Sequence, residues 1–406
     1  MIKITSLGGS GEDSRNCFLV ESKNGSLLLD CGVRREIAEV SKVYPGLTKD
    51  IAQNLSVVLI SHAHEDHIAA LPYLYELGYR GCIYASLETI ELIPSYLHKW
   101  VDYVRQNNGT LPFDEENLKK LVFRSVDELP FPNQKGRDGH IIGGLWYRLE
   151  LDGSSLLYTG DLTYDSLLLD ADPLPKADIL IIDSAYAGSV LNQEEQYGKL
   201  LRTAQRVIAN GGKLLLPVPA NGRGIDMFVF LCRHRLPLYA ESNIIQNTAA
   251  LSQQQRWVKP FDFPVSGFTA VDKTSRETAL GAGISGVYLF GDGMMTSPAS
   301  RQYFEAVKSD PRSCIIISGH TAKGTLGNSL LNADFRQQNG IRASAERLTI
   351  KVHNDEDDVL KIAEKVCPKY MMLFHAPKDH CEKLTETLNA RGITTVCGTG
   401  QALTVR

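Results

Sequence analysis

The first sixty residues consist mainly of short apolar runs that end at Gly, Asn or Asp, a pattern typical of β-strands. Strands are predicted at residues 2–7, 17–21, 26–30 and 55–60. Apolar residues then recur at helical spacing up to Gly78, which predicts a helix over residues 67–77. Further strands are predicted at 145–149, 155–158 and 179–182. The first half of the chain therefore alternates sheet and helix.

A second α/β pattern follows residue 183. It predicts helices and strands in the order helix 193–209, strand 213–217, helix 224–232, strand 286–290 and strand 314–318. The last part of the chain predicts helix 357–366, strand 370–374, helix 379–390 and strand 394–397. We therefore expect two domains, one inserted in the other.

Composition places the chain among ordinary globular proteins. It has 406 residues, of which 43% are hydrophobic and 22% charged, and its net charge is -4. This balance excludes a globally basic nucleic-acid coat, although positive charge confined to one cleft is compatible with it. No run approaches the ~18 apolar residues of a membrane span, and no signal peptide is apparent. We expect no membrane association and a cytoplasmic location.

The strongest chemical signal is the stretch from Ser61 to His67, which reads Ser-His-Ala-His-Glu-Asp-His. It lies where an apolar strand ends and a helix begins, and strand ends are where open α/β folds place their sites. Imidazole and carboxylate groups suit zinc or manganese. Alternation along an extended segment points His62 and His64 the same way, so they can share one metal. Asp66 and His67 face another direction and predict a second metal beside the first.

Two later residues extend this set in chain order. His140 precedes a predicted strand, and Asp161 ends one. Each is weak evidence alone, because a lone histidine is often structural and an Asp after Gly is often a turn residue. Together with the H-x-H-x-D-H stretch they form a candidate ligand set.

This order of residues resembles the metallo-β-lactamase superfamily, in which H-x-H-x-D-H is followed by a single His and by an Asp that bridges the metals. More of the chain resembles its β-CASP branch of nucleases, which includes ribonuclease J and the mRNA 3′-end cleavage factor. The matching segments are 8–12, 29–32, 177–186, 211–217, 221–223, 293–294 and 324–327. The resemblance spans essentially the whole chain.

The resemblance also places three later residues in the site. His353 and His375 fall where the branch has its last two histidines, and Asp183 ends its first additional motif. His375 closes an apolar strand and is expected to bind the second metal, whereas His353 precedes a polar turn and is better placed to reach substrate. Asp183 either orients a ligand imidazole or is a strand-end turn residue.

Substrate contacts are expected in the inserted part. The loop 319–327 offers backbone donors, the Thr325 hydroxyl and the Lys323 ammonium, and such loops can hold anions. An ordinary loop is the alternative, because the spacing is not that of a P-loop. Arg223 could contact phosphate or pair with an acid.

The predicted fold is an αββα metallo-β-lactamase domain of residues 1–187 and 337–406, with an α/β β-CASP cap of residues 188–336. The predicted function is hydrolysis of nucleic-acid phosphodiesters by a hydroxide that bridges two Zn²⁺ ions, with Mn²⁺ as the alternative. Asp66, His353 and Asp183 are the expected catalytic residues. RNA is the expected partner, single-stranded DNA is an alternative, and a homodimer is left open.

Two other functions also fit parts of the pattern. A hydrolase of small thioesters or lactones would use the same metals, but would not need a cap that carries Arg223 and Lys323. A processing subunit that binds RNA without cutting it would be expected to have lost metal ligands. All seven expected ligands are present in the sequence, namely His62, His64, Asp66, His67, His140, Asp161 and His375.

Overall fold

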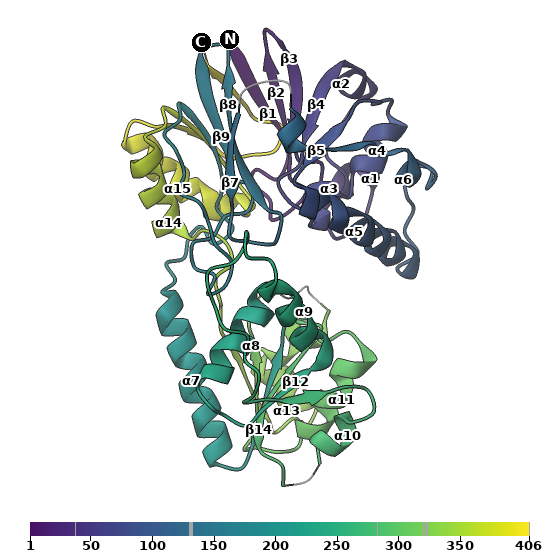
Figure 1. The fold of residues 1–406 in the computed structure, drawn as a ribbon, viewed down its shortest axis with the longest axis vertical. Coiled ribbons are helices and arrows are strands. Elements are labelled where there is room, and N and C mark those ends of the chain that lie inside the picture. The colour runs from purple at the N-terminus through teal and green to yellow at the C-terminus, as the bar shows by residue number, and fades with distance from the viewer. Residues whose placement is uncertain (37, 130–132, 282, 320, 322–323, 406) are drawn as a thin grey trace. The chain divides into compact units, whose positions relative to one another are not determined.

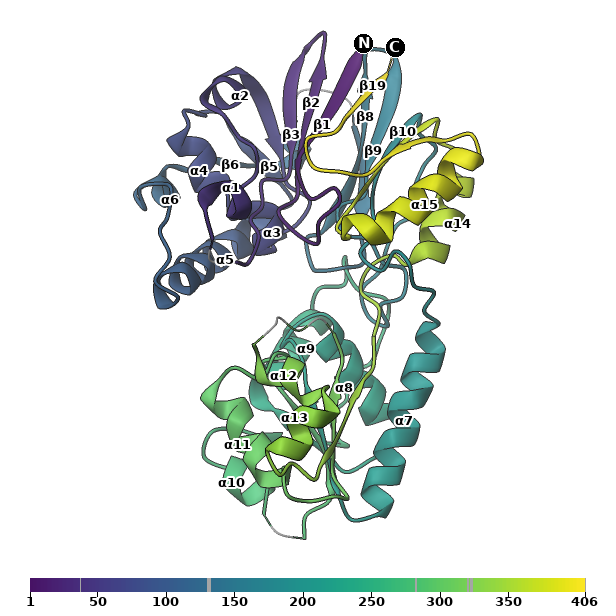
Figure 2. The same ribbon diagram turned by 180° about the vertical axis from the view of Figure 1, so that it is seen from behind.

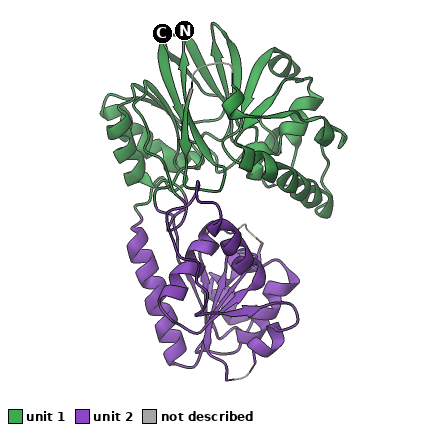
Figure 3. Ribbon diagram, in the orientation of Figure 1, with its two compact units in different colours: residues 1–164, 170–190, 353–406 green, residues 165–169, 191–352 purple. Residues whose placement is uncertain are grey.

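The computed structural model describes residues 1–36, 38–129, 133–281, 283–319, 321 and 324–405. The chain forms two compact units, which Figure 3 shows in separate colours. Unit 1 comprises residues 1–164, 170–190 and 353–406, and unit 2 comprises residues 165–169 and 191–352. One unit is therefore inserted in the other, as the alternating pattern predicts.

Unit 1 is built on two mixed sheets. The first has the strand order β19-β1-β2-β3-β4-β5-β6 and the second the order β18-β17-β10-β9-β8-β7. The strands of the first sheet are β1 (Ile2–Gly8), β2 (Cys17–Ser22), β3 (Gly25–Leu29), β4 (Leu55–Leu59), β5 (Ile83–Ala85), β6 (Phe123–Ser125) and β19 (Ala402–Val405). Those of the second are β7 (Asn133–Arg137), β8 (Leu145–Leu151), β9 (Ser154–Tyr158), β10 (Ile179–Asp183), β17 (Tyr370–Phe374) and β18 (Thr394–Val396).

The two sheets pack face to face through aromatic side chains. The ring of Phe18 in β2 lies 5.7 Å from that of Tyr158 in β9 and 5.2 Å from that of Phe374 in β17. Strands β4 and β10 are buried almost throughout, which explains why each appears in the sequence as a continuous apolar run.

Helices cover the outer faces of both sheets. They are α1 (Val40–Val43), α2 (Lys49–Asn54), α3 (Glu65–Ile68), α4 (Leu71–Glu76), α5 (Leu87–Gln106), α6 (Asn117–Lys120), the 3-10 turn Val126–Glu128, α14 (Glu356–Val366) and α15 (Lys378–Ala390). Figure 1 shows α3 to α5 beside the first sheet and α14 and α15 beside the second. Trp100 of α5 shares a buried cluster with Val58, and Leu384 of α15 shares another with Leu180. The expected αββα arrangement is confirmed.

The helix predicted over residues 67–77 is interrupted. It forms two short helices, α3 and α4, separated by Ala69 and Ala70. Pro72 lies in the first turn of α4, where its missing N–H costs nothing. Inside one continuous helix the proline ring would clash with the carbonyl of Ile68, so the helix ends and begins again.

Unit 2 has a six-stranded parallel sheet in the order β13-β12-β14-β11-β15-β16. Its strands are β11 (Lys213–Pro217), β12 (Leu238–Glu241), β13 (Thr269–Val271), β14 (Gly286–Phe290), β15 (Cys314–Ile317) and β16 (Ser344–Arg347). Its helices are α7 (Gln193–Ala209), α8 (Arg223–Arg233), α9 (Ser242–Ser252), α10 (Arg276–Ala279), α11 (Pro298–Val307), α12 (Leu326–Leu330) and α13 (Ala333–Gln338). Figure 2 shows α7 on one side of this sheet and α10 and α11 on the other.

The units do not end at the residues expected from the sequence. Residues 337–352, assigned above to the metallo-β-lactamase domain, pack with unit 2 because β16 pairs in parallel with β15. Residues 165–169 also join unit 2, where the Ser166 hydroxyl lies 3.0 Å from Oδ2 of Asp226. The pairing of β16 with β15 therefore moves the second boundary to residue 352.

Candidate metal centre

The histidine-rich stretch leaves β4 as an extended segment before α3 begins. His64, the residue before α3, has extended backbone angles (φ -66°, ψ 149°). Two residues of such a segment that are separated by one position point to the same side. Nε2 of His62 accordingly lies 3.0 Å from Nδ1 of His64.

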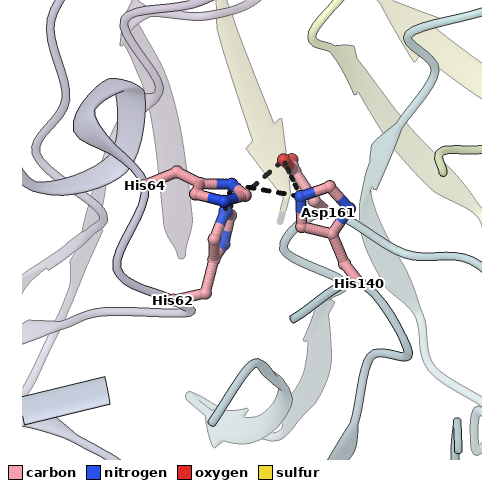
Figure 4. Close-up of side chains that lie close together, drawn as sticks. All are labelled: His62, His64, His140 and Asp161. Carbon is pink, nitrogen blue, oxygen red and sulfur yellow. Dashed lines mark hydrogen bonds and ion pairs between the residues drawn. The ribbon is translucent and has the colours of Figure 1, made fainter. Parts of the chain in front are cut away.

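His140 and Asp161 join these two histidines, so that four side chains converge, as Figure 4 shows. Nε2 of His140 lies 3.1 Å from Nδ1 of His64, and Oδ2 of Asp161 lies 3.5 Å from Nε2 of both His62 and His140. Ligand atoms placed tetrahedrally at about 2.1 Å from a zinc ion are about 3.4 Å apart. The spacing therefore fits one tetrahedral metal ion.

A second group of ligand atoms shares Asp161 with the first. Nε2 of His375 lies 3.1 Å from Oδ2 of Asp66, and Nε2 of His67 lies 3.2 Å from Oδ1 of Asp161. Oδ2 of Asp161 lies 3.6 Å from Nε2 of His375. One carboxylate thus lies beside both groups of possible ligand atoms.

The loop after β3 supports His67 of the second group through a side-chain contact. The buried carboxylate of Asp30 lies 2.6 Å from Nδ1 of His67 and accepts hydrogen bonds from the Ser61 hydroxyl and the Tyr158 hydroxyl. A carboxylate on Nδ1 leaves Nε2 as the metal-binding nitrogen of an imidazole. Asp30 therefore fixes the orientation of His67.

This support requires a glycine at position 32. A Cβ atom there would lie 1.6 Å from the carbonyl oxygen of Asp66, so any side chain would push the loop away from α3. The close approach allows the Cys31 N–H to donate a hydrogen bond to the His67 carbonyl at 2.7 Å. Gly32 thereby keeps the Asp30 loop against the two ligands of α3.

His375 follows β17 in a strained conformation. Its φ of 68° lies in the left-handed region, which is unfavourable for a residue with a side chain. Its backbone N–H donates to the Gly9 carbonyl at 2.8 Å, and this hydrogen bond helps to hold the turn. Strain of this kind is concentrated at functional sites, where surrounding structure enforces it.

His353 and Asp183 lie at the edge of the same cluster. Nδ1 of His353 is 3.1 Å from Oδ2 of Asp183 and 3.8 Å from Oδ2 of Asp161. Asp183 is fully buried and also accepts a hydrogen bond from the Ala185 N–H at 2.9 Å. The Asp183 carboxylate therefore contacts the imidazole of His353. His353 also forms a third group with Asp161 and His375, so the geometry brings it close to metal-binding distance.

The charges within the cluster favour bound cations. Burial lowers the pKa of His62, and it lowers that of His64 to about 4, so both imidazoles are neutral at pH 7, as metal ligands must be. Burial opposes protonation of His375, but Asp161 and Asp66 outweigh it and raise its pKa to about 10. Burial would also raise the pKa of Asp161, but the surrounding imidazoles hold it well below its ordinary value.

The residues present fit divalent metal ions. Oδ1 of Asp161 is buried and has Nε2 of His67 at 3.2 Å, but no hydrogen bond of good geometry, and Nδ1 of His375 is buried without a hydrogen-bond partner among the described residues. A buried carboxylate oxygen in that state is costly unless a cation satisfies it. Nitrogen and oxygen donors in this number are ligands of divalent metals, and we therefore describe the cluster as a divalent-metal site.

Comparison with known proteins agrees with this site. A family model described as the metallo-beta-lactamase superfamily matches residues 10–210, and one described as the Beta-Casp domain matches residues 230–330. The chain belongs to the metallo-β-lactamase superfamily, in its β-CASP branch. The resemblance inferred from the sequence is thereby confirmed.

Relatives from this branch align along most of the chain. The transcription termination factor FttA of Methanothermobacter thermautotrophicus is 26% identical over 90% of this chain and 65% of its own length. The RNase J-like protein of Methanocaldococcus jannaschii is 26% identical over 93% of each chain. Cleavage and polyadenylation specificity factor 73 of Drosophila melanogaster is 24% identical over 95% of this chain and 61% of its own length. The chain thus spans slightly less than two thirds of the FttA and Drosophila proteins.

A solved structure shows the same fold. The crystal structure of a protein of unknown function from Enterococcus faecalis V583 aligns over 99% of each chain with a TM-score of 0.60 and 14% sequence identity. At this identity the likeness concerns the fold alone.

Of the substrate-binding residues expected from the sequence, Arg223 and Thr325 are described, and both belong to unit 2. Arg223 begins α8, and its guanidinium lies where a side chain on Gly319 would be. The Thr325 hydroxyl accepts from the Asn328 N–H at 3.3 Å and caps α12. Lys323 lies outside the described residues.

Three residues near the metal site were not predicted from the sequence. They are Asp30, Asp138 and Asn16. Oδ1 of Asp138 accepts a hydrogen bond from the His140 N–H at 2.8 Å, and Nδ2 of Asn16 lies 2.8 Å from Nε2 of His67. Asp30 ends an apolar strand, the same signal that identified Asp161, and could have been found in that way. Asp138 and Asn16 follow no such pattern.

Among the described residues, no helix combines the length and the apolar character that crossing a membrane requires.

Proposed function

We propose that this chain is a metal-dependent ribonuclease that hydrolyses phosphodiester bonds in RNA. The observation that carries the proposal is the carboxylate of Asp161, which faces two separate groups of nitrogen and oxygen ligands. Two-metal sites of this kind are used for displacement at phosphorus. A relative that covers this chain almost completely is named an RNase J-like protein.

We assign two Zn²⁺ ions to these groups, with Mn²⁺ as the alternative. His62, His64 and His140 would hold one ion and Asp66, His67 and His375 the other, with Asp161 shared. Bound metals at such a site lower the pKa of water and offset the charge of phosphoryl oxygens. Asp66 contributes to catalysis through its place in the second group.

His353 is assigned to the substrate. Its Nδ1 lies against the Asp183 carboxylate, so Nε2 is the nitrogen left to meet a phosphate oxygen. A carboxylate on Nδ1 holds the imidazole in one direction, with Nε2 toward the substrate. Asp183 acts by fixing the tautomer and direction of His353.

We further assign RNA contacts to Arg223, Lys323 and Thr325 of the inserted unit. The test is the salt dependence of binding, because each lost phosphate contact lowers the log-log slope by about 0.7 for a single strand. Arg223→Ala and Lys323→Ala should each weaken binding and flatten that slope. If the salt dependence of RNA binding keeps the same slope in both variants, these residues do not contact RNA phosphates.

The decisive experiment compares substrates. Purified protein is incubated with 5′-labelled single-stranded RNA, the matching DNA and a generic thioester, with and without chelator. Chelator-sensitive cleavage of RNA supports the proposal, and product lengths distinguish internal from terminal cutting. Turnover of the thioester alone would favour the small-molecule hydrolase, whereas tight RNA binding without cleavage by the metal-loaded protein would favour a non-cleaving subunit. A cytoplasmic location and a homodimer remain predictions.

A further inference from the structure

A cavity of about 280 Å³ adjoins the metal site within unit 1. His64 and Asp66, which belong to the two metal-ligand groups, form part of its wall. A chemical group bound in this cavity would therefore be only a few covalent bonds away from an atom held at the metals. At about 30 Å³ per water molecule the volume corresponds to about nine waters, enough for one heterocyclic ring system.

Tyr96 of helix α5 also lines the cavity. Tyr96, Lys99 and Tyr103 are spaced three and four residues apart, so they lie on the same side of the helix. The neighbouring face carries Ile93, Leu97, Trp100 and Val104, which are buried in the core and anchor the helix. Tyr96 is thereby held on a rigid element beside the metal ligands.

Aromatic rings and cations alternate along this face. The Lys99 ammonium lies 4.5 Å from the centroid of the Tyr96 ring, and the Arg35 guanidinium lies 4.7 Å from the centroid of the Tyr103 ring. The Tyr96 ring also meets His64 edge to face, with 5.6 Å between ring centroids. Interleaved aromatic and basic side chains are the usual means of holding single-stranded nucleic acid, because bases stack on the rings and cations follow the backbone.

The remaining wall residues favour a base over a phosphate as the occupant. The Glu65 carboxylate lines the cavity and would repel a phosphate, although Arg35 pairs with it at 3.4 Å. The same carboxylate can accept hydrogen bonds from the N–H groups of a base. Val33 adds an apolar surface and Ser14 lies at the cavity wall as a further polar side chain.

We propose that this cavity is a nucleobase subsite, in which Tyr96 stacks on the base of a nucleotide that flanks the scissile phosphodiester. The inference rests on the proposed ribonuclease function and adds a substrate position to it. Tyr103 and Glu65 hold Arg35 in place. From there Arg35 can contact the edge of that base, or the phosphate of the next nucleotide on its 5′ or 3′ side. The Lys99 ammonium contacts the same Tyr96 ring and helps to hold it in place.

The test uses RNA oligonucleotides that carry one abasic residue. Metal-loaded wild-type protein first maps the cut, and an abasic residue is then placed in turn at each nucleotide around it. Binding to chelator-treated protein is measured by fluorescence anisotropy, so that cleavage does not interfere. The variants are Tyr96→Ala and Tyr96→Phe, with Tyr370→Ala as the control, since Tyr370 is a half-buried tyrosine at the start of β17, at the other end of that strand from His375.

For the wild type, one abasic position beside the cut should raise Kd by about 5- to 150-fold, the factor that corresponds to ~1–3 kcal/mol for one stacked base. Tyr96→Ala should weaken binding of intact RNA by a similar factor and should show no further loss at that position. Tyr96→Phe and Tyr370→Ala should keep the wild-type abasic penalty. If Tyr96→Ala unfolds, Tyr96→Leu keeps the bulk and removes the stacking.

An abasic penalty that is as large in Tyr96→Ala as in the wild type would overturn the base subsite. Equal weakening of all RNAs by Tyr96→Ala, together with a lower salt slope, would show that the cavity holds a phosphate instead. Failure of the proposed function has a different signature: the metal-loaded wild type would leave RNA intact, and no cut could be mapped.

Discussion

The carboxylate of Asp183 holds the imidazole of His353, with 3.1 Å between Oδ2 and Nδ1. The carboxylate itself is fixed at the end of β10, where it is fully buried and accepts hydrogen bonds from the backbone N–H groups of Ala185 and Leu162. A buried acid held in this way sets both the tautomer and the direction of the imidazole. His353 is thus oriented by a residue that belongs to the sheet.

Replacing Asp183 with Asn tests this orientation. The change keeps the size of the side chain and removes the negative charge beside Nδ1 of His353. We expect single-turnover RNA cleavage to fall about 10- to 100-fold, while the metal content stays the same. Metal analysis and rapid-quench kinetics on the same preparation measure both quantities. Loss of metal without loss of rate per bound metal would assign Asp183 to the metal site instead.

The two C-terminal histidines should differ when each is replaced by Ala. His375 lies 3.1 Å from Asp66 and belongs to a metal-ligand group, so His375→Ala should lower metal occupancy and activity together. His353→Ala should keep both metals and reduce cleavage by on the order of 10² to 10³, the effect of removing one preorganised donor. His98→Ala, at an exposed position on α5, is the control. The reverse pattern of metal loss would mean that His353 is the ligand.

Asp30→Asn should weaken binding of the second metal proposed above without removing any of the side chains assigned to it. Asp30 lies 2.6 Å from Nδ1 of His67, and loss of such a partner lowers metal affinity by about 10- to 100-fold. Competition with a chromophoric chelator measures the two affinities. Asp178→Asn is the matched control, because Asp178 also accepts hydrogen bonds but precedes β10 at the end away from the site. Equal effects of the two substitutions would argue against a specific role.

Asp226 predicts a pH dependence of stability in unit 2. Burial raises the pKa of this carboxyl to about 6, although the Leu167 N–H and the Ser166 hydroxyl favour its charged form. Because the unfolded chain ionises near pH 4, it releases protons before the folded chain does, and stability falls as pH rises from about 4 to about 6. The loss amounts to about 3 kcal/mol on this scale.

Urea unfolding of wild type and Asp226→Asn between pH 4 and pH 7 measures this dependence. The stability difference between the two proteins should change over that interval and become constant above it, because only the wild type carries the titrating group. Both series are run with chelator, so that metal binding does not contribute. A constant difference throughout would show that Asp226 titrates at its ordinary pKa.

The sequence determined those features that depend on neighbouring residues. Apolar runs located β4, β10 and β17, since strands buried on both faces need continuous apolar residues. The alternation of His62 and His64 predicted that they share one side, because an extended chain places every second side chain there. Helix α5 was not predicted, and Pro94 lies inside it, where proline normally interrupts a helix.

Only the tertiary structure decided which distant residues meet. His140, Asp161 and His375 come from separate loops, and their approach to His62 and His67 follows from the packing of one sheet on the other. The supporting carboxylates Asp30 and Asp138 act through hydrogen bonds, which leave no periodic signal in the chain. The cavity beside Tyr96 likewise depends on how α5 lies against the loop that carries Arg35. Local periodicity reports which face of an element is buried, whereas the site is made by loops whose positions depend on long-range packing.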